Sequence, residues 1–395
     1  MNRFIKQTRW VGSSNVSCLV VLIVIGSSTP VAQAQVPTAQ LQEEIRYGSV
    51  WDEDSMLSWV VGMSLHGDSL LLILDGHDEA IKVFDWSGEP VGQIGRPGSG
   101  PGEFRTPRSL RVRNDTIFVL NAGTRSLNLL TISGDELARF RLPPIPVTGG
   151  VRSVVSPSGM FPDGTFLGLA SASRPYLFKE HSEYSFPILK IGRNGEVLDT
   201  LAFHREFTGK RVHLPQVMAQ PYLVPPPKTG DAYSFSTQSG IIAVAEGFPE
   251  GQDTQYRITA IHQTGDTIFS RLYSFQPQRI TKEQRTALAL RFGPMAQRSR
   301  RLRDVLEEAY ATRPYIPPVS GIRIDRDGRF WVGREWVPEE PVVWEVLSPQ
   351  GDPLFNIEFP AGVSPGVVSG NHLWAVERDE MDVRYIVRYR IVFPE

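Results

Sequence analysis

The sequence predicts an all-β fold, a six-bladed β-propeller, on the basis of three observations. A turn made of a polar residue, a glycine and an acid recurs after apolar stretches. A second kind of turn, polar or glycine-containing, leads six times into a short apolar strand. Several intervals between these strands are close to the forty-odd residues of a four-stranded blade. With 35 Gly and 31 Pro in 395 residues, the composition also favours a turn-rich chain.

Residues 1–34 have the organisation of a secretory signal peptide. A positively charged start precedes a short apolar run, and Ala32-Gln33-Ala34 forms a small-residue cleavage site. The apolar run is too short to span a bilayer as a helix. We expect cleavage after Ala34, which leaves residues 35–395 as one propeller domain in the periplasm or outside the cell.

Charge and cysteine content limit the partners of the mature chain. The 41 Lys and Arg nearly balance the 43 Asp and Glu, so charge gives no reason to expect nucleic acid as a partner. The one cysteine, Cys18, lies inside the apolar run, and the mature chain must therefore rely on its core rather than on disulfides. No later stretch has the character of a transmembrane segment, and we expect a monomer.

The first repeat is a β-hairpin turn. Glycine supplies the positive φ of a tight turn without steric cost, and each copy follows an apolar-rich stretch. Five hairpins are therefore expected, at Ser87-Gly88-Glu89, Ser133-Gly134-Asp135, Asn194-Gly195-Glu196, Thr264-Gly265-Asp266 and Gln350-Gly351-Asp352.

The second repeat gives the number of blades. Its six apolar strand positions are Leu70, Ile117, Phe166, Ile241, Phe330 and Leu373. Intervals of 47, 49 and 43 residues separate three of the neighbouring pairs, and the two longer intervals must contain insertions. The sixth blade reaches the end of the chain before its outer strand. We expect Ile45–Val50, from the front of the mature chain, to supply that strand and close the ring.

Two segments carry a family resemblance. Gly95–Phe104, followed by Pro107, resembles the inter-blade segment of NHL-type repeats, and Ile81–Asp85 with Gly88-Glu89 resembles their third strand and hairpin. The best match covers residues 70–142, and the whole chain resembles exported bacterial NHL-like six-bladed propellers. The resemblance implies the fold and export, and it implies no particular activity.

Three insertions depart from a plain ring. Residues 171–187 and 204–231 have the composition of loops, whereas residues 281–312 have helical periodicity. A capping pair of Thr281 and Gln284 and a break at Gly293-Pro294 predict two short amphipathic helices between the fourth and fifth blades. The insertion is basic, and this charge fits either a patch for an anionic partner or a solvated helix face.

No residue set identifies a catalytic reaction, a metal site or a cofactor. The glycine-rich segment at 95–102 lacks the Lys-Ser/Thr of a phosphate loop, and no G-x-S-x-G elbow occurs. No pair of histidines has the spacing of metal ligands. Asp75, His77 and Asp78 follow a strand, where such residues commonly serve turn geometry, although a metal cluster is the rival interpretation.

The channel mouth is the candidate ligand site. The inner strands are expected to start near Trp59, Arg108, Arg152, Tyr233, Ile322 and Val367, where carboxylates are sparse. Arg108, Arg152 and Tyr233 could bind an anionic ligand, since guanidinium groups pair bidentately with carboxylates. Local salt bridges or solvent exposure of the arginines is the alternative. Aromatic residues near turns could mark a glycan or protein site where exposed: Tyr222, Tyr315, Trp336 and Trp374.

Two functions fit these features. The first is a non-catalytic binding or scaffold propeller in the periplasm or extracellular space, for an unknown protein or an anionic or glycan ligand. The second is a lactonase-like, metal-dependent hydrolase or lyase that acts at the central channel. The missing carboxylate set favours the first.

Overall fold

The computed structural model describes residues 36–48, 52, 55–141, 153–172, 183–207, 211–212, 222–223, 231–246, 254–290, 294–312, 315–334, 341–379 and 383–393. Residues 36–395 form one compact unit, and the predicted signal peptide lies outside the described residues. No helix within the described ranges has the length and apolar character needed to cross a membrane.

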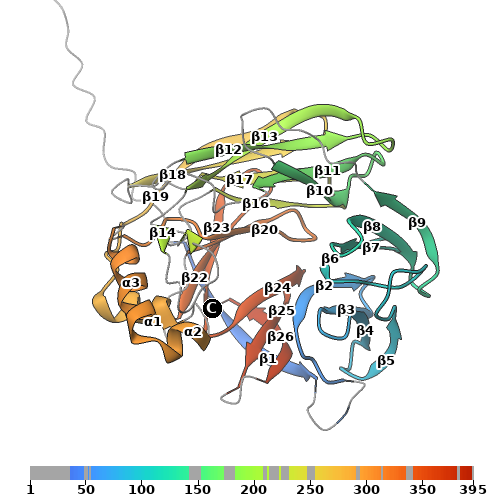
Figure 1. Cartoon of the computed structure of the whole chain (residues 1–395), viewed down its shortest axis with the longest axis horizontal. Coiled ribbons are helices and arrows are strands. Elements are labelled where there is room, and N and C mark those ends of the chain that lie inside the picture. The colour runs from blue at the N-terminus through green and yellow to red at the C-terminus, as the bar shows by residue number, and fades with distance from the viewer. Residues whose placement is uncertain are drawn as a thin grey trace, which may run out of the picture. The chain divides into compact units, whose positions relative to one another are not determined.

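Four blades are antiparallel sheets of four consecutive strands each (Figure 1). The first blade contains β2 (Val60–His66), β3 (Leu70–Asp75), β4 (Ala80–Asp85) and β5 (Pro90–Ile94). The second contains β6 (Pro107–Arg113), β7 (Thr116–Asn121), β8 (Ser126–Thr131) and β9 (Glu136–Arg141). The third contains β10 (Ser153–Met160), β11 (Phe166–Ala172), β12 (Glu183–Ile191) and β13 (Val197–Phe207). The fourth contains β16 (Ala232–Phe235), β17 (Ile241–Ala245), β18 (Gln255–His262) and β19 (Thr267–Ser274).

The last two blades share an eight-stranded sheet. The fifth consists of β20 (Gly321–Ile324), β21 (Phe330–Gly333), β22 (Val342–Leu347) and β23 (Pro353–Phe359). The sixth consists of β24 (Ser364–Ser369), β25 (His372–Arg378), β26 (Arg384–Val392) and the N-terminal strand β1 (Thr38–Tyr47). β1 runs antiparallel to β26 from Gln40 opposite Val392 to Tyr47 opposite Ile386. Its first residues also make a short parallel pairing with β23, which joins the two blades.

The prediction that an N-terminal strand closes the ring is confirmed, with a correction to its bounds. The strand begins at Thr38 and ends at Tyr47, before the end of the expected Ile45–Val50 segment. Ala39 and Tyr47 lie in the core, whereas Glu43 is exposed, next to an irregularity in the pairing between Glu43 and Ile45. The seven residues before Ile45 are largely polar, which conceals the strand from a search for apolar runs.

The predicted hairpin glycines adopt the left-handed backbone conformation. Gly88, Gly134, Gly195, Gly265 and Gly351 have φ values between 83° and 96°. Each glycine lies in the turn between the third and fourth strands of its blade. An L-amino acid with a side chain is strained in this region, so these five positions favour glycine.

The core is distributed between neighbouring sheets rather than collected at one centre. One cluster joins the first two blades through Leu72, Phe104 and Leu110. Another joins the sixth blade to the first through Trp374, Tyr47 and Phe84. Trp374 is fully buried, so the expectation that it is an exposed aromatic is wrong. It lies within β25, where large aromatic side chains fill the wedge between sheets.

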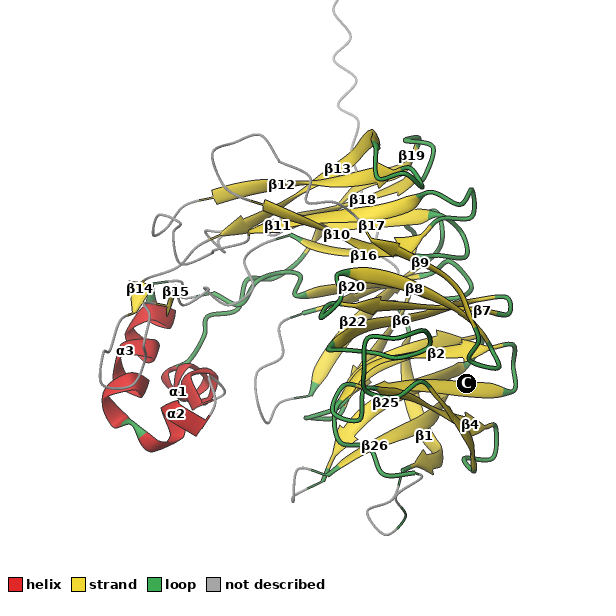
Figure 2. Ribbon diagram, turned by 45° about the vertical axis from the view of Figure 1, so that its right-hand side comes forward, coloured by secondary structure: helices red, strands yellow, loops and turns green. Residues whose placement is uncertain are grey.

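The helical insertion lies between β19 and β20, as predicted, but it contains three helices instead of two (Figure 2). They are α1 (Lys282–Leu290), α2 (Pro294–Arg298) and α3 (Arg300–Ala311). The capping pair is confirmed, because the backbone N–H of Gln284 donates to Thr281 Oγ1 at 3.2 Å. The additional break arises at Ser299, whose side chain caps α3 by accepting from the backbone N–H of Leu302.

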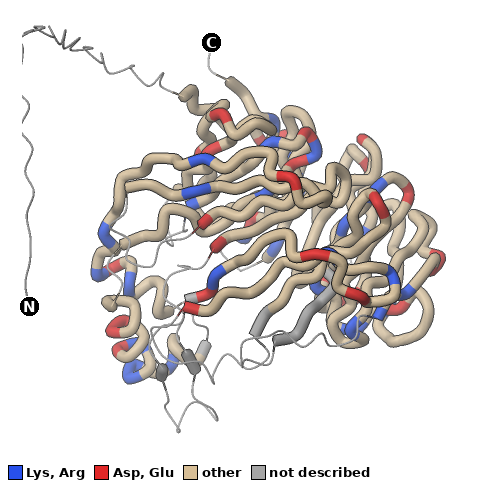
Figure 3. Tube along the Cα trace, turned by 90° about the horizontal axis from the view of Figure 1, so that it is seen from above, with Lys and Arg blue, Asp and Glu red and all other residues tan. Residues whose placement is uncertain are grey.

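Other insertion boundaries also change. The expected loops at 171–187 and 204–231 are shorter than predicted. The end of the first loop belongs to β12 and the start of the second belongs to β13. A two-residue ribbon, β14 (Arg211–Val212) with β15 (Tyr222–Leu223), lies in the second of these segments. Basic and acidic positions are interspersed over the described chain (Figure 3). The helices carry both signs, including Arg300, Arg301 and Glu308.

Candidate functional site

The centre of the ring contains two adjoining cavities, of about 470 Å³ and about 880 Å³. Their walls come from the inner strands β2, β6, β10, β16, β20 and β24, one from each of the six blades. The residues common to both cavities are Ser109, Arg111, Ser234, Phe235, Arg323 and Pro365. We call these two cavities and the residues between them the central channel.

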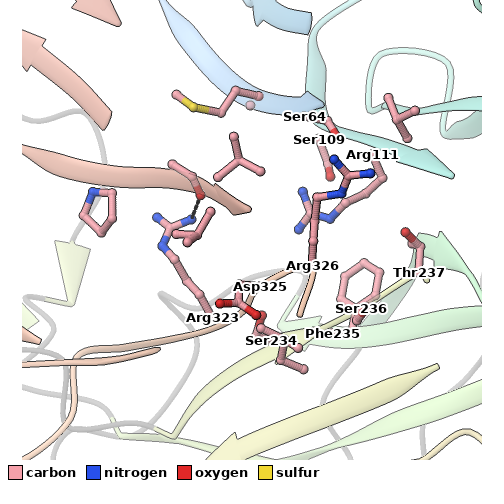
Figure 4. Close-up of a pocket in the computed structure, with 18 of the residues that line it drawn as sticks. Ser64, Ser109, Arg111, Ser234, Phe235, Ser236, Thr237, Arg323, Asp325 and Arg326 are labelled. Atoms are coloured by element: carbon pink, nitrogen blue, oxygen red, sulfur yellow. Dashed lines mark hydrogen bonds between the residues drawn. The ribbon is translucent and has the colours of Figure 1, made fainter. Parts of the chain in front are cut away.

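Two arginines reach into the central channel from different sides (Figure 4). Arg111 in β6 donates to the backbone carbonyl of Leu110 at 2.9 Å and lies 5.2 Å from the ring centre of Phe235. Arg323 in β20 donates to the carbonyl of Gly366 at 3.3 Å and lies 5.9 Å from the ring of Trp344. Neither arginine forms an ion pair with an acidic residue within the described part of the chain.

The enclosure of the two guanidinium groups affects their protonation. Burial between the blades lowers the pKa of Arg111. Burial, together with the charge of the neighbouring Arg111, lowers the pKa of Arg323 to about 10. The Arg323 side chain has solvent-exposed surface because the channel is hollow, while protein surrounds it on the other sides. An arginine guanidinium stays protonated at neutral pH, so the two groups repel each other and a bound anion would interact favourably with both.

The carboxylate nearest in sequence to Arg323 is already satisfied. Asp325 accepts from Arg329 Nε at 2.6 Å and from the indole nitrogen of Trp331 at 2.9 Å. Its other oxygen accepts two backbone N–H groups at the following turn, from Asp327 and Arg329. The carboxyl side chain is only 1% exposed, so it stabilises the turn and leaves Arg323 without a counter-charge.

The basic lining continues towards the turns at one end of the channel. A third cavity of about 760 Å³ there includes Arg113, Arg326 and His66. Arg326 donates to the carbonyl of Gly67 at 2.7 Å and also contacts Asp68. His66 pairs with Asp115 at 2.8 Å. Arg326 and His66 therefore each have an acidic partner at this end, in contrast to Arg111 and Arg323.

The residues predicted for ligand binding are only partly brought together. Arg108 lines the smaller cavity, where its guanidinium lies 5.3 Å from the ring of Trp59. Tyr233 lines the larger cavity, and its ring centre lies 4.8 Å from that of His204 with the two rings tilted. Burial, followed by the charge of Glu206, raises the pKa of Tyr233. Arg152 lies outside the described residues.

Arg111 and Arg323 were not predicted as site residues from the sequence, because the candidate positions were the first residues of each inner strand. Both arginines lie further along, as single charges between apolar neighbours, in Leu110-Arg111-Val112 and Ile322-Arg323-Ile324. Leu110, Val112 and Ile322 are all buried. An arginine flanked on both sides by apolar residues of an inner strand is the signal that would have found them.

Asp75, for which the sequence left open a metal cluster or a turn, has a structural role in the turn. The Asp75 carboxylate is fully buried and accepts backbone N–H groups of Ser58, Trp59 and His77 at 2.7–3.2 Å. It therefore organises the turn after β3. Considering only residues that the structure describes, no group of three or more His, Cys, Asp or Glu could hold a metal ion.

Comparison with known proteins agrees with the fold. Residues 53–130 match a family model described as "6-bladed beta-propeller". No curated protein matches the sequence.

Solved structures with a similar course of chain include a candidate exported protein from Bacteroides fragilis, at 16% identity and a TM-score of 0.48, covering 89% of this chain and 95% of that one. Regucalcin, a calcium-binding protein from Agrobacterium tumefaciens, is 10% identical with a TM-score of 0.42, covering 90% and 96%. Virginiamycin B lyase from Staphylococcus aureus is 11% identical with a TM-score of 0.37, covering 90% and 100%. The strand topology and the family model together identify the chain as a six-bladed β-propeller, and the family model matches the region that resembles NHL-type repeats.

Proposed function

We propose that this protein is a non-catalytic binding propeller of the periplasm or extracellular space, and that its central channel holds an anionic ligand. The observation that supports this function is the pair Arg111 and Arg323, two charged groups that line one cavity without a carboxylate partner in the described residues. Guanidinium groups bind carboxylates and phosphates through paired hydrogen bonds, so such an arrangement suits an anion. The location rests on the signal-peptide pattern of residues 1–34.

The alternative is a metal-dependent hydrolase or lyase acting at the same channel. Such a reaction needs several oxygen or nitrogen ligands for the metal. The described inner strands present arginine and serine at the channel instead. We therefore prefer the binding function. Measurement of the metal content of the purified protein separates the two, because a tightly bound stoichiometric Ca²⁺ or Zn²⁺ would favour the enzyme.

Thermal unfolding of the purified protein tests the binding function. Citrate, glutarate, phosphate and D-glucuronate should be compared with glycerol and acetamide as neutral controls. We expect at least one anion to raise the unfolding temperature of the wild type, and this effect to be lost in the Arg111→Gln/Arg323→Gln variant. Arg301→Gln is the matched control, because Arg301 is exposed on α3. Equal stabilisation of the wild type and the double variant, or no effect of any anion, would contradict the proposal.

A further inference from the structure

The central channel also presents a set of unused hydroxyl groups. Ser64 in β2, Ser109 in β6 and Ser234 in β16 all line the smaller cavity (Figure 4). None of their hydroxyls makes a hydrogen bond with another side chain or with the backbone in the described part of the chain. Each hydroxyl can donate one hydrogen bond and accept two. Three blades therefore direct free hydrogen-bonding groups into the space that the two arginines occupy.

The hydroxyls and the arginines lie on the same elements. Ser109 and Arg111 are two residues apart in β6, so their side chains leave the strand on the same face. Ser234 in β16 lines the same two cavities as Ser109 and Arg111. A ligand whose acidic group meets Arg111 would therefore place its remaining atoms next to Ser109 and Ser234.

The remaining wall offers apolar surface of limited extent. Met63, Val367 and Phe235 contribute to the same cavity. An aliphatic or aromatic acid would fill the cavity but displace water from the serine hydroxyls without replacing its hydrogen bonds, which lowers affinity. A polyhydroxylated compound satisfies those hydroxyls with its polar edges and contacts the apolar wall with its C–H faces. The cavity of about 470 Å³ lies within the usual range of small-molecule sites, about 300–1,000 Å³.

We infer that the anionic ligand of the central channel is a sugar that carries an acidic group. This inference rests on the proposed function and specifies its ligand. The carboxylate or phosphate of the sugar pairs with Arg111 and Arg323. Its hydroxyls exchange hydrogen bonds with Ser64, Ser109 and Ser234. Recognition requires both parts, the negative charge and the polyol.

Isothermal titration calorimetry of the purified protein tests this inference with four kinds of ligand. D-Glucuronate, D-galacturonate and D-gluconate carry a carboxylate on a polyol, and D-glucose 6-phosphate carries a phosphate, which separates the two acidic groups. D-Glucose has the polyol alone, and hexanoate has the carboxylate alone. We expect at least one of the four acidic sugars to bind at least about tenfold more tightly than glucose and hexanoate.

Three variants assign the contacts. Ser109→Ala/Ser234→Ala should weaken binding of the acidic sugar about 5- to 150-fold, the loss expected for two hydrogen bonds, and should leave hexanoate unaffected. Arg111→Gln should weaken binding of both kinds of acid about 10- to 100-fold, as expected for hydrogen bonds to a charged group. Ser69→Ala is the matched control, because Ser69 is exposed in the turn before β3 and outside the cavity. Circular dichroism spectra should establish that each variant is folded.

The outcomes distinguish this inference from the proposed function. If hexanoate binds as tightly as every acidic sugar, and Arg111→Gln weakens it, the channel is an anion site but the sugar inference is overturned. If none of the four acidic sugars binds, the inference is overturned as well. If acids bind but their affinity changes neither in Arg111→Gln nor in Arg111→Gln/Arg323→Gln, both the proposed function and the inference are wrong.

Discussion

The carboxylate of Glu44 in β1 links the closing strand to the sixth blade, and its replacement provides a sharp test. Glu44 accepts hydrogen bonds from Arg388 Nε at 3.1 Å and from Arg390 Nε at 2.7 Å, and it lies 3.4 Å from His372 Nε2. Arg388 in turn donates to the carbonyl of Trp86 at 2.8 Å and lies over its ring. Glu44 therefore connects the N-terminal strand with the sixth blade and, through Arg388, with the first.

Glu44→Gln should lower the free energy of unfolding by about 2 kcal/mol at pH 7. A hydrogen bond to a charged group contributes about 1.5–3 kcal/mol, and glutamine retains an acceptor while it loses the charge. The Arg388 side chain is only 7% exposed, and Glu44→Gln removes the negative charge beside it. The substitution therefore leaves a buried positive charge without its carboxylate partner, which is costly. Glu43→Gln is the control, because Glu43 is half-exposed, contacts Arg46 and should contribute about 0.5 kcal/mol or less.

Urea unfolding at several pH values completes this test. Burial alone would raise the pKa of Glu44, but the hydrogen bond from Arg390 and the charges of Arg390, His372 and Arg388 outweigh it and lower the pKa. Glu44 therefore stabilises the fold above its unfolded-state pKa, and this contribution is lost as the pH falls through its lower folded-state pKa. The difference between wild type and Glu44→Gln should disappear in acid. A loss no larger than that of Glu43→Gln at pH 7 would refute the reasoning.

Three further predictions concern the channel and the core. Arg323→Gln should stabilise the protein without ligand by about 1 kcal/mol in urea unfolding, because it removes a repelled charge that channel water screens in part; a destabilised variant would argue against the repulsion. Anion affinity measured by calorimetry should stay constant from pH 7 to 9 and fall as the pH rises through about 10, where Arg323 loses its proton; a fall near pH 7 would implicate another group. Trp331→Ala should cost about 3–5 kcal/mol because the indole is 1% exposed, and Trp331→Phe should cost less; equal costs would exclude a cavity as the cause.

The sequence predicts the fold well because turn chemistry is local. A polar residue, a glycine and an acid specify a hairpin without reference to the rest of the chain, as Gly88 and Gly265 illustrate. Repetition of that signal implies the ring. The outer strand of the last blade is predictable because an exposed sheet edge must be covered. Its start is not predictable, because Thr38–Glu44, the first seven of its ten residues, are largely polar.

The site is less predictable because it depends on contacts across the ring. Arg111 and Arg323 are more than 200 positions apart, and no local pattern states that β6 and β20 face one channel. Whether an arginine is compensated depends on the surrounding hydrogen bonds. Asp325 is two residues from Arg323 but is occupied by Arg329 and Trp331. Whether an arginine has a free or an occupied carboxylate beside it therefore becomes known only from the three-dimensional structure.

The most direct test of the central claim is a crystal structure of the protein soaked in selenate, whose anomalous scattering locates the anion. We expect a selenate peak within hydrogen-bonding distance of both Arg111 and Arg323. A channel without such a peak, or a carboxylate of the chain itself seated between the two guanidinium groups, would contradict it.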